Sequence, residues 1–387
     1  MQALLALEDG RIFHGRSFGH STEAGAEIVF CTAMSGYQEV VTDPSYRGQL
    51  IVFTSPHIGN YGIHEGHGES PRAWAEGVIV RDLCERPAHP ESTASFRQFI
   101  RRHRLCGMDG VDTRALTLHL REHGTMRAYF TTRIHDPEEA VELARQVPPM
   151  SERSLVADVT SPRPHFREPG EDGGVRRHAG ADAPARHPHA CGDSSVPHVA
   201  ILDYGLKESI ARALAIRGCR LTILPAYTDP ALLDSLHPDG VVLSNGPGDP
   251  EALISLVGTV RHAVDRYPTL AICLGHQLAG LALGGRIRKL RFGHHGANHP
   301  VQDLRTGAVT ITSQNHNYAV DVDSLPDGVM LTHINLNDGT GEGFIDRERR
   351  LWSYQFHPEG APGPHDARVI FDEFVGALSR EAVADAP

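Results

Sequence analysis

Hydrophobic and polar positions form a regular pattern in the second half of the chain. Short continuous apolar runs alternate there with segments of helical period, and the runs read HVAILDY, RLTILPA, GVVLSNG and TLAICLG. Continuous apolar strands between helices are typical of a parallel sheet that helices cover on both faces. We therefore predict that residues 198–387 form a doubly wound α/β domain, whose ligand site lies at the carboxyl ends of the strands.

The first 150 residues show a different pattern. Two apolar runs flank the dipeptide Asp9-Gly10, which predicts a β-hairpin. Further short strands and two helices follow, and Gly124 ends the second helix. The predicted strands lie at 28–31, 50–54 and 77–81, and the predicted helices at 92–104 and 112–123. This mixture predicts a smaller α+β domain over residues 1–150.

A segment of unusual composition separates these two parts. Residues 161–197 are rich in Pro, Gly, Arg and His, contain almost no large apolar side chain, and show neither a helical nor a strand period. Such a stretch cannot bury enough surface to offset the entropy cost of ordering it. We predict a mobile linker over residues 151–197.

Composition and charge narrow the classes of function. The 387 residues carry 37 Lys and Arg against 48 Asp and Glu, a net charge of −11, whereas nucleic-acid binding needs a basic surface. No apolar run approaches the roughly 20 residues of a membrane span, and the acidic Glu8 disagrees with a secretory signal. The six cysteines form no CxxC pair, which disfavours a disulfide framework and a zinc ribbon. We expect a cytoplasmic protein with no nucleic-acid or membrane partner.

The first candidate for chemistry is Cys273, which directly follows the apolar run Thr269–Ile272 and precedes a helix. A nucleophile on a tight strand-to-helix turn is exposed at the sheet edge, and the helix N-terminus favours its thiolate form. Gly275 and Ala271 supply the small residues that such a turn needs on either side. The alternative interpretation is a buried structural cysteine.

Two further segments complete a possible site. Ser244-Asn245-Gly246-Pro247-Gly248-Asp249-Pro250 follows another apolar strand and could form a rigid loop that stabilises an oxyanion, although it could equally be an ordinary turn. Near the end, His357 and Glu359 flank Pro358, so that their side chains project to the same face of an extended chain. Cysteine chemistry needs such a histidine and a carboxylate that orients it. Alone, this pair is typical of a solvated strand end.

Together, these three segments resemble the class I, triad-type, glutamine amidotransferases. The N-terminal part adds motifs that other members of this class lack, and with them the chain is similar to the small, glutamine-hydrolysing subunits of carbamoyl phosphate synthetases. These motifs are MSGYQE at 34–39, TDPSY at 42–46, PHIGN at 56–60 and VDTR at 111–114, and FGHHG at 292–296, NHP at 298–300, QNH at 314–316 and PGPHD at 362–366 follow later.

The resemblance implies specific roles for residues of this chain. Cys273 would be the nucleophile, and His357 and Glu359 would complete a catalytic triad. The implied L-glutamine site comprises Ser45, Gly246, Gly248, Leu274, Gln277, Asn315, Asn317 and Tyr318. The resemblance also implies a large partner subunit that binds ATP and Mg²⁺ and makes carbamoyl phosphate for arginine and pyrimidine biosynthesis. This chain itself would carry no cofactor.

The chain departs from the family pattern at a few positions. Asn317 stands where the family usually has Gly, so we expect it to adopt a left-handed backbone conformation. Ala271 and Ser209 also differ from the usual Gly and Asn. None of these changes removes a catalytic atom.

Other functions are weaker interpretations of this sequence. His294, His295 and His299 could suggest zinc, but no carboxylate or Cys lies at ligand spacing along the chain, so no metal is expected. The chain could instead be the amidotransferase subunit of another synthase, or a catalytically silent interaction subunit.

Overall fold

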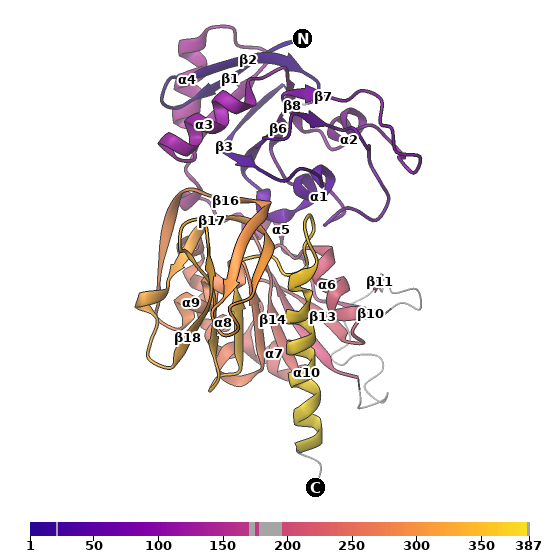
Figure 1. Ribbon diagram of the computed structural model, residues 1–387, viewed down its shortest axis with the longest axis vertical. Coiled ribbons are helices and arrows are strands. Elements are labelled where there is room, and N and C mark those ends of the chain that lie inside the picture. The colour runs from indigo at the N-terminus through magenta and orange to yellow at the C-terminus, as the bar shows by residue number, and fades with distance from the viewer. Residues whose placement is uncertain (21, 170–174, 178–195, 385–387) are drawn as a thin grey trace.

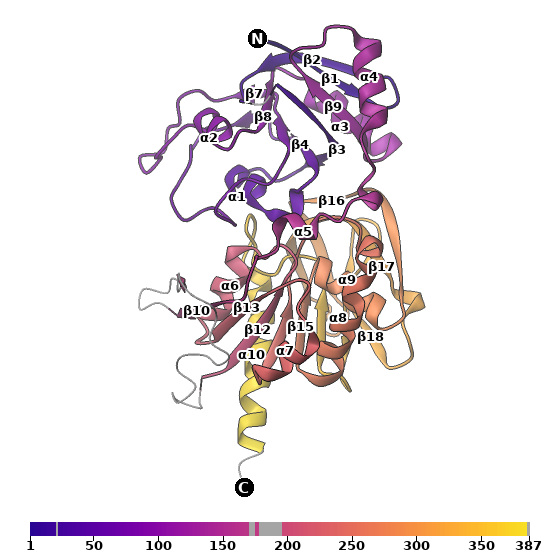
Figure 2. The same ribbon diagram turned by 180° about the vertical axis from the view of Figure 1, so that it is seen from behind.

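The structure is a computed structural model of the chain, and it describes residues 1–20, 22–169, 175–177 and 196–384. Two lobes lie one above the other in Figure 1 and, from behind, in Figure 2. The N-terminal lobe is drawn in indigo to magenta, and the C-terminal lobe in pink to yellow. The short helix α5 (Val156–Val159) lies at the boundary between them in both views.

The N-terminal lobe is built around a closed barrel in which parallel and antiparallel pairings are mixed. The predicted hairpin is confirmed, since β1 and β2 pair antiparallel across Asp9-Gly10 and Gly10 has a φ of 100°. The barrel strands, in their order around it, are β1 (Gln2–Leu7), β2 (Ile12–Ser17), β8 (Cys106–Asp109), β6 (Gly77–Ile79), β4 (Gln49–Phe53), β3 (Glu23–Cys31) and β9 (Met126–Thr131). A separate pair joins β5 (His57–Ile58) to β7 (Asp82–Leu83).

Four α-helices accompany this barrel: α1 (Tyr37–Thr42), α2 (Phe96–Arg102), α3 (Thr113–His123) and α4 (Pro137–Gln146). The predicted second helix is confirmed as α3, which Asp112 caps by accepting a hydrogen bond from the Ala115 N–H. The predicted first helix is shorter than expected, because Ser95 and Gln98 form a capping box that starts α2 only at Phe96. The lobe is α+β, as predicted.

The C-terminal lobe contains one large sheet with the predicted parallel strands at its centre. Its central strands β13, β12, β14, β15 and β20 run parallel, and the strands beyond β20 pair antiparallel. In order across the sheet, the strands are β11 (Val175–Arg177), β10 (His165–Pro169), β13 (Arg220–Pro225), β12 (His198–Asp203), β14 (Gly240–Leu243), β15 (Thr269–Ile272), β20 (Leu351–Tyr354), β19 (Gly341–Asp346), β18 (Val329–Asn335), β16 (Arg286–Asp303) and β17 (Val309–Asp321). Its helices are α6 (Glu208–Ala215), α7 (Pro230–Ser235), α8 (Ile254–Arg266), α9 (Leu274–Ala282) and α10 (Val369–Ala384).

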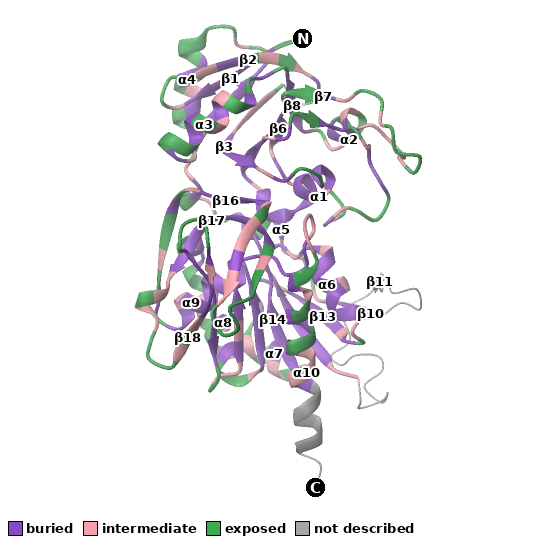
Figure 3. Cartoon of the chain, in the orientation of Figure 1, coloured by how far each residue is buried: buried purple, intermediate pink, exposed green. Residues whose placement is uncertain are grey.

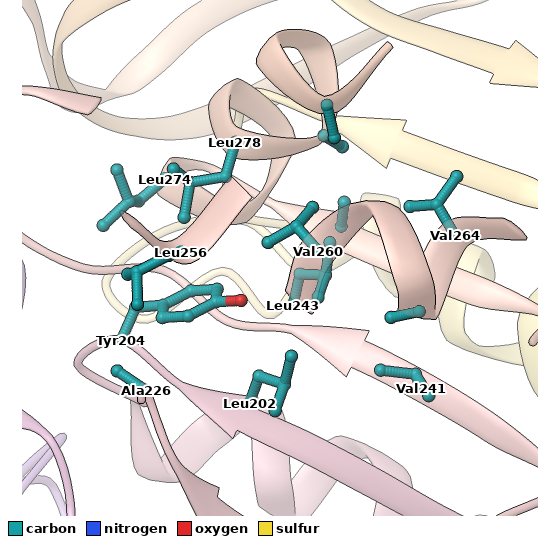
Figure 4. Close-up of a cluster of buried hydrophobic side chains, with 14 of the residues drawn as sticks. Leu202, Tyr204, Ala226, Val241, Leu243, Leu256, Val260, Val264, Leu274 and Leu278 are labelled. Carbon is teal, nitrogen blue, oxygen red and sulfur yellow. The ribbon is translucent and has the colours of Figure 1, made fainter. Parts of the chain in front are cut away.

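Both faces of this sheet are buried, which explains the continuous apolar strands. Along β14, Val241 and Leu243 belong to the core cluster that α8 and α9 cover, whereas Val242 packs into the cluster under α6 and α10. Figure 4 shows the first cluster, and Figure 3 shows buried residues concentrated in the strands. Each fully buried Val or Leu contributes about 1.5–3 kcal/mol. The doubly wound α/β fold is therefore confirmed.

The predicted linker 151–197 differs from the structure in its first part. Residues 150–152 form a 3-10 turn, α5 follows, and β10 pairs antiparallel with β13. Leu155, Val156 and Phe166 are buried, and these scattered apolar residues anchor the segment although they show no clear period. Residues 170–174 and 178–195, where most of the unusual composition lies, fall outside the described residues. Among the residues that the structure describes, no helix has the length and apolar composition needed to cross a bilayer.

Candidate active site

Cys273 lies at the carboxyl end of β15, on the sharp turn that leads into α9. Its φ of 54° and ψ of −107° form a strained conformation for a residue with a Cβ, and such conformations cost about 1–3 kcal/mol. The turn presses against β14, because a Cβ at Gly275 would lie only 2.3 Å from the Leu243 carbonyl oxygen. The thiol is 2% exposed, and Sγ lies 3.5 Å from the carbonyl oxygen of Asn315. This position on a strained strand-to-helix turn is typical of a catalytic nucleophile.

His357 and Glu359 follow β20, the parallel neighbour of β15, so they reach the same edge of the sheet as Cys273. The His357 N–H donates to the Ser313 carbonyl oxygen over 2.9 Å, which fixes the backbone of this segment. His357 Nδ1 lies 2.7 Å from Glu359 Oε1, and both side chains are buried. A carboxylate in this position orients the imidazole and stabilises its charged form.

Lys207 extends this pair, although no role was predicted for it from the sequence. Its Nζ lies 2.8 Å from Glu359 Oε1, and the side chain is only 1% exposed. A buried charge needs a partner, because the cost of removing an isolated ion from water is several kcal/mol. The only sequence signal for Lys207 is its position after the first parallel strand, at the edge where ligands bind.

The charges in this group determine its protonation. Burial and the nearby Lys207 lower the pKa of His357, but the Glu359 carboxylate and Cys273 together outweigh them and raise this pKa to about 10. Burial raises the pKa of Glu359, yet Lys207 and His357 together hold it well below its usual range. At neutral pH the histidine is an imidazolium and the glutamate is ionised.

A pocket opens beside Cys273 and brings most of the predicted glutamine-site residues together. In addition to Cys273, its lining includes Ser45, Gly246, Gly248, Gln277, Asn315, Asn317 and Tyr318. Leu274 does not line the pocket, but its side chain packs against Gly246, where an added Cβ would approach Leu274 Cδ2 to 2.8 Å. The pocket is also lined by Gln49, Met150 and His316, which are not among the predicted glutamine-site residues.

The N-terminal lobe contributes directly to this pocket through Asp43 and Ser45. Asp43 Oδ1 accepts a hydrogen bond from the Ser45 N–H over 2.8 Å, and Oδ2 accepts one from Asn315 Nδ2 over 3.3 Å. Ser45 Oγ accepts a hydrogen bond from Asn245 Nδ2 over 2.9 Å. Asp43 carries no large signal in the sequence beyond its place in the TDPSY motif. These contacts make the pocket a joint product of both lobes.

The prediction of a left-handed Asn317 is wrong. Asn317 lies inside the long strand β17 and is absent from the residues with positive φ. Its side chain determines its role, since Nδ2 donates to Glu27 Oε2 over 2.6 Å and Oδ1 lies 2.8 Å from His295 Nε2. His295 Nδ1 in turn lies 2.9 Å from Asn315 Oδ1. A chain of side chains therefore joins Glu27 of the N-terminal lobe to the pocket.

Carboxylates distant in sequence approach His294, which the spacing of His294, His295 and His299 along the chain did not reveal. His294 Nε2 lies 2.9 Å from Asp338 Oδ2, and His294 Nδ1 lies 3.4 Å from Glu342 Oε1. Burial lowers the pKa of His294, but these two carboxylates raise it to about 9. His294 therefore forms an ion pair with Asp338 and Glu342.

Comparison with known proteins agrees with this geometry. Residues 5–130 match the family described as carbamoyl-phosphate synthase small chain, CPSase domain, and residues 200–377 match glutamine amidotransferase class-I. Relatives named carbamoyl phosphate synthase small chain include one from Solidesulfovibrio magneticus, 45% identical with 98% of this chain and 99% of the relative covered. Another, from Aquifex aeolicus, is 42% identical and covers 96% of this chain and 98% of its own length.

The fold, the cysteine on its strand-to-helix turn and these matches define a class I glutamine amidotransferase domain joined to a second, N-terminal domain. The chain belongs to the family of carbamoyl phosphate synthase small chains.

Proposed function

We propose that this chain hydrolyses L-glutamine with Cys273 as nucleophile and delivers the ammonia to a separate carbamoyl phosphate synthase large subunit. The observation that carries this proposal is the position of Cys273. It lies on a strained turn, at the sheet edge that His357 and Glu359 also reach, and in a pocket lined by seven of the eight predicted glutamine contacts.

In the first half of the reaction, the Cys273 thiolate attacks the carboxamide carbon of glutamine. A carbon–sulfur bond forms and an electron pair moves onto the carbonyl oxygen, where N–H groups near Gly246 and at Leu274 stabilise the charge. His357 starts as the imidazolium and gives its proton to the departing nitrogen. The carbon–nitrogen bond breaks, ammonia leaves, and a glutamyl thioester remains on Cys273.

In the second half, water hydrolyses the thioester. Neutral His357 takes a proton from the water as its oxygen attacks the thioester carbon, and the carbon–sulfur bond then breaks. Glutamate leaves and the thiolate–imidazolium pair is restored. Glu359 orients the His357 ring throughout. The positive charge of Lys207 balances the negative charge of the Glu359 side chain, so that Glu359 stays ionised.

The ammonia needs an acceptor that this chain does not provide by itself. The sequence contains no GxxxxGK[ST] motif, and the relatives are named as small chains, which implies a larger companion. We infer that the large subunit binds ATP and Mg²⁺ and combines ammonia with bicarbonate, in the cytoplasm, for arginine and pyrimidine biosynthesis.

The experiment compares the full chain alone with the full chain co-expressed with the large subunit of its own organism. Glutamate release and carbamoyl phosphate formation are measured with glutamine and, separately, with added ammonium. We expect glutamate and carbamoyl phosphate to form together from glutamine in the complex. Glutamine hydrolysis without any carbamoyl phosphate would favour another synthase, and no hydrolysis in either preparation would favour a silent interaction subunit.

A further inference from the structure

Two loops of the N-terminal lobe are tied together on the side of the molecule where α1 lies. The first loop follows β5 and the second follows β7, and an isolated bridge joins them at Ile63 and Ala94. The Ile63 N–H donates to the Ala94 carbonyl oxygen over 2.9 Å, and the Thr93 N–H donates to the Ile63 carbonyl oxygen over 2.8 Å. A further bond of 2.8 Å runs from the Ala88 N–H to the Asn60 carbonyl oxygen. The residues beside this bridge are thus held in fixed relative positions.

Three metal-ligating side chains gather next to the bridge. His64 follows Ile63 directly, while His89 and Glu91 come from the second loop, and one donor atom of each lies within 4.8 Å of the other two. The rings of His64 and His89 meet edge-on with their centroids 4.7 Å apart. His64 is 7% exposed, whereas His89 and Glu91 are exposed to solvent. The group therefore has one anchored member and an open side.

The hydrogen bond of His64 prepares it to act as a ligand. Its Nε2 lies 3.0 Å from the Tyr61 carbonyl oxygen, which can only accept, so Nε2 carries the hydrogen. In the neutral ring, Nδ1 then holds a lone pair. Metal-bound histidines commonly donate their other N–H to a backbone carbonyl in this way, which fixes both the tautomer and the ring orientation.

Further donors line the same cavity, whose volume is about 560 Å³. Glu39 Oε2 is buried and has no hydrogen-bond partner among the described residues, and Glu39 Oε1 lies 3.9 Å from His67 Nδ1. The His67 ring stacks on that of His64 at 5.1 Å. Residues 360–363, which directly follow Glu359, form part of the opposite wall. The cavity has room for an ion with water or a fourth side chain.

We propose that His64, His89 and Glu91 bind a divalent transition-metal ion of the zinc class. Two imidazoles and one carboxylate are a donor set that suits Zn²⁺ and leaves a fourth position open. Tetrahedral zinc places its ligand atoms about 3.4 Å apart, so the exposed His89 and Glu91 need only close slightly around the ion. The ion would clamp the two loops at the boundary between the lobes.

The buried group His294, His316 and Glu342 provides a useful contrast. Its donor atoms also lie within 4.8 Å of one another. However, Glu342 accepts hydrogen bonds from Asn335 Nδ2 and Gln314 Nε2, each over 2.9 Å, and both ring nitrogens of His316 are engaged. Those donors are held by buried protein partners. In the group at His64, His89 Nδ1 accepts a hydrogen bond of 3.3 Å from the Glu91 N–H, but the ring is exposed and faces an open cavity.

No metal was expected on this chain from the sequence, because His64, His89 and Glu91 are not neighbours along it. His64 and Glu91 are separated by 26 intervening residues, and only the bridge between the two loops brings them together. This inference does not depend on the proposed glutamine hydrolysis.

The test is Zn²⁺ titration of the full chain by isothermal titration calorimetry. His178, His187 and His189 lie outside the described residues and could bind zinc adventitiously, so all variants are made in a background where these three are replaced by Asn. We expect one saturable Zn²⁺ site per chain in that background. The double variant His89→Ala/Glu91→Ala should weaken it at least tenfold, as losing even an outer-shell partner commonly does.

The matched control is His135→Ala/Glu138→Ala, which removes one exposed histidine and one exposed glutamate from the same lobe and should bind zinc like the background chain. Zinc should also raise the unfolding temperature of the background chain and of the control, and it should raise that of the double variant by less. The single variant Glu91→Gln serves if the double variant fails to fold. Absence of saturable binding, or equal affinity in all variants, would overturn the proposal.

Discussion

Buried hydrogen bonds between single residues hold the candidate glutamine pocket in shape. Asn317 contacts both Glu27 and His295, and His295 reaches Asn315, which itself contacts Asp43. Each buried polar atom in such a chain depends on its neighbour, because an unsatisfied group costs about 1–3 kcal/mol. We therefore expect that a substitution at one residue of this chain changes the shape of the pocket.

Replacing Asn317 with Gly tests this dependence. Although the family usually has Gly here, the Asn317 amide of this chain contacts both Glu27 and His295. Removing the amide leaves both side chains without this hydrogen-bond partner. We expect the KM for glutamine to rise about 5- to 150-fold, which corresponds to about 1–3 kcal/mol. Steady-state kinetics measure the effect, with the exposed Asn337→Gly as control. Unchanged kinetics for Asn317→Gly would show that the side chain has no such role.

The sequence identified the candidate catalytic residues better than it identified what supports them. Cys273, His357 and Glu359 lie in short motifs, and each motif follows a strand of the parallel sheet. Lys207, Glu27 and His295 were missed as supporting residues because their partners lie far away along the chain. Position 317 was misjudged since the family pattern suggested a backbone requirement where the structure has a side-chain network.

The ionisation of a single residue, His294, also affects the stability of the protein. Burial lowers its pKa, but Asp338 and Glu342 raise it to about 9, against about 6.5 in the unfolded chain. The folded state therefore keeps a proton that the unfolded state loses, so this contribution to stability is present at low pH and disappears as the pH rises through about 9. The pKa of His357 is also raised in the folded protein, so its contribution to stability likewise decreases as the pH rises.

We predict that the free energy of unfolding falls less between about pH 7.5 and 10 in His294→Asn than in the unchanged protein, by about 1–3 kcal/mol. Urea unfolding at several pH values measures this. His276→Asn is the control, because burial lowers the pKa of His276 to about 3 and the ring stays neutral over this range. An identical pH dependence for His294→Asn would contradict the proposed ion pair.

At the scale of whole elements, the strand-to-helix turn between β15 and α9 places the nucleophile. The apolar run and the following helix were both evident from the sequence, since hydrophobic periodicity determines them locally. Closure of the N-terminal barrel was not, because it depends on pairings such as β1 with β9 between distant segments. The helix α4 and the strand β10 were also missed, the latter because it lies in a segment with few apolar residues.

Gly275→Ala tests the importance of close packing at this turn. The added Cβ would approach the Leu243 carbonyl oxygen to 2.3 Å, so the turn must shift and carry Cys273 with it. A displacement of about 1 Å at a reacting atom costs about 100-fold in turnover, and we expect a loss of that order in glutamine hydrolysis. Steady-state turnover of the purified variant measures the loss.

The matched control for this variant is Gly258→Ala. Gly258 lies in the middle of α8, and a Cβ there meets no atom within 4 Å. Alanine should stabilise the helix by about 0.5–1 kcal/mol and leave turnover unchanged. Equal turnover in the two variants would mean that packing at Gly275 does not position the nucleophile.

At the scale of the molecule, the pocket exists only because two lobes meet. Ser45 and Gln49 reach it from the N-terminal lobe, and Asp43 bonds to Asn315 across the boundary. Hydrophobic patterns describe each lobe separately and say nothing about how the lobes pack. The resemblance to a family supplied Ser45 as a candidate, and the structure adds Asp43 as the residue that positions it.

Asp43→Ala should therefore impair glutamine binding although Asp43 does not itself line the pocket. Its loss frees the Ser45 N–H and Asn315 Nδ2, and we expect the KM for glutamine to rise about tenfold, or about 1.4 kcal/mol. Asp82→Ala, an exposed carboxylate of the same lobe, is the control in the same kinetic assay. If both variants behave alike, the contact between the lobes does not shape the site.

The most direct test of the account is the activity of Cys273→Ser in the assembled complex. A serine hydroxyl is far less acidic than a thiol, so the variant should lose glutamine-dependent carbamoyl phosphate synthesis while it keeps synthesis from added ammonium. Cys84→Ser, at a partly exposed cysteine outside the pocket, should retain both activities. Substantial glutamine-dependent synthesis by Cys273→Ser would contradict the assignment of Cys273 as the nucleophile.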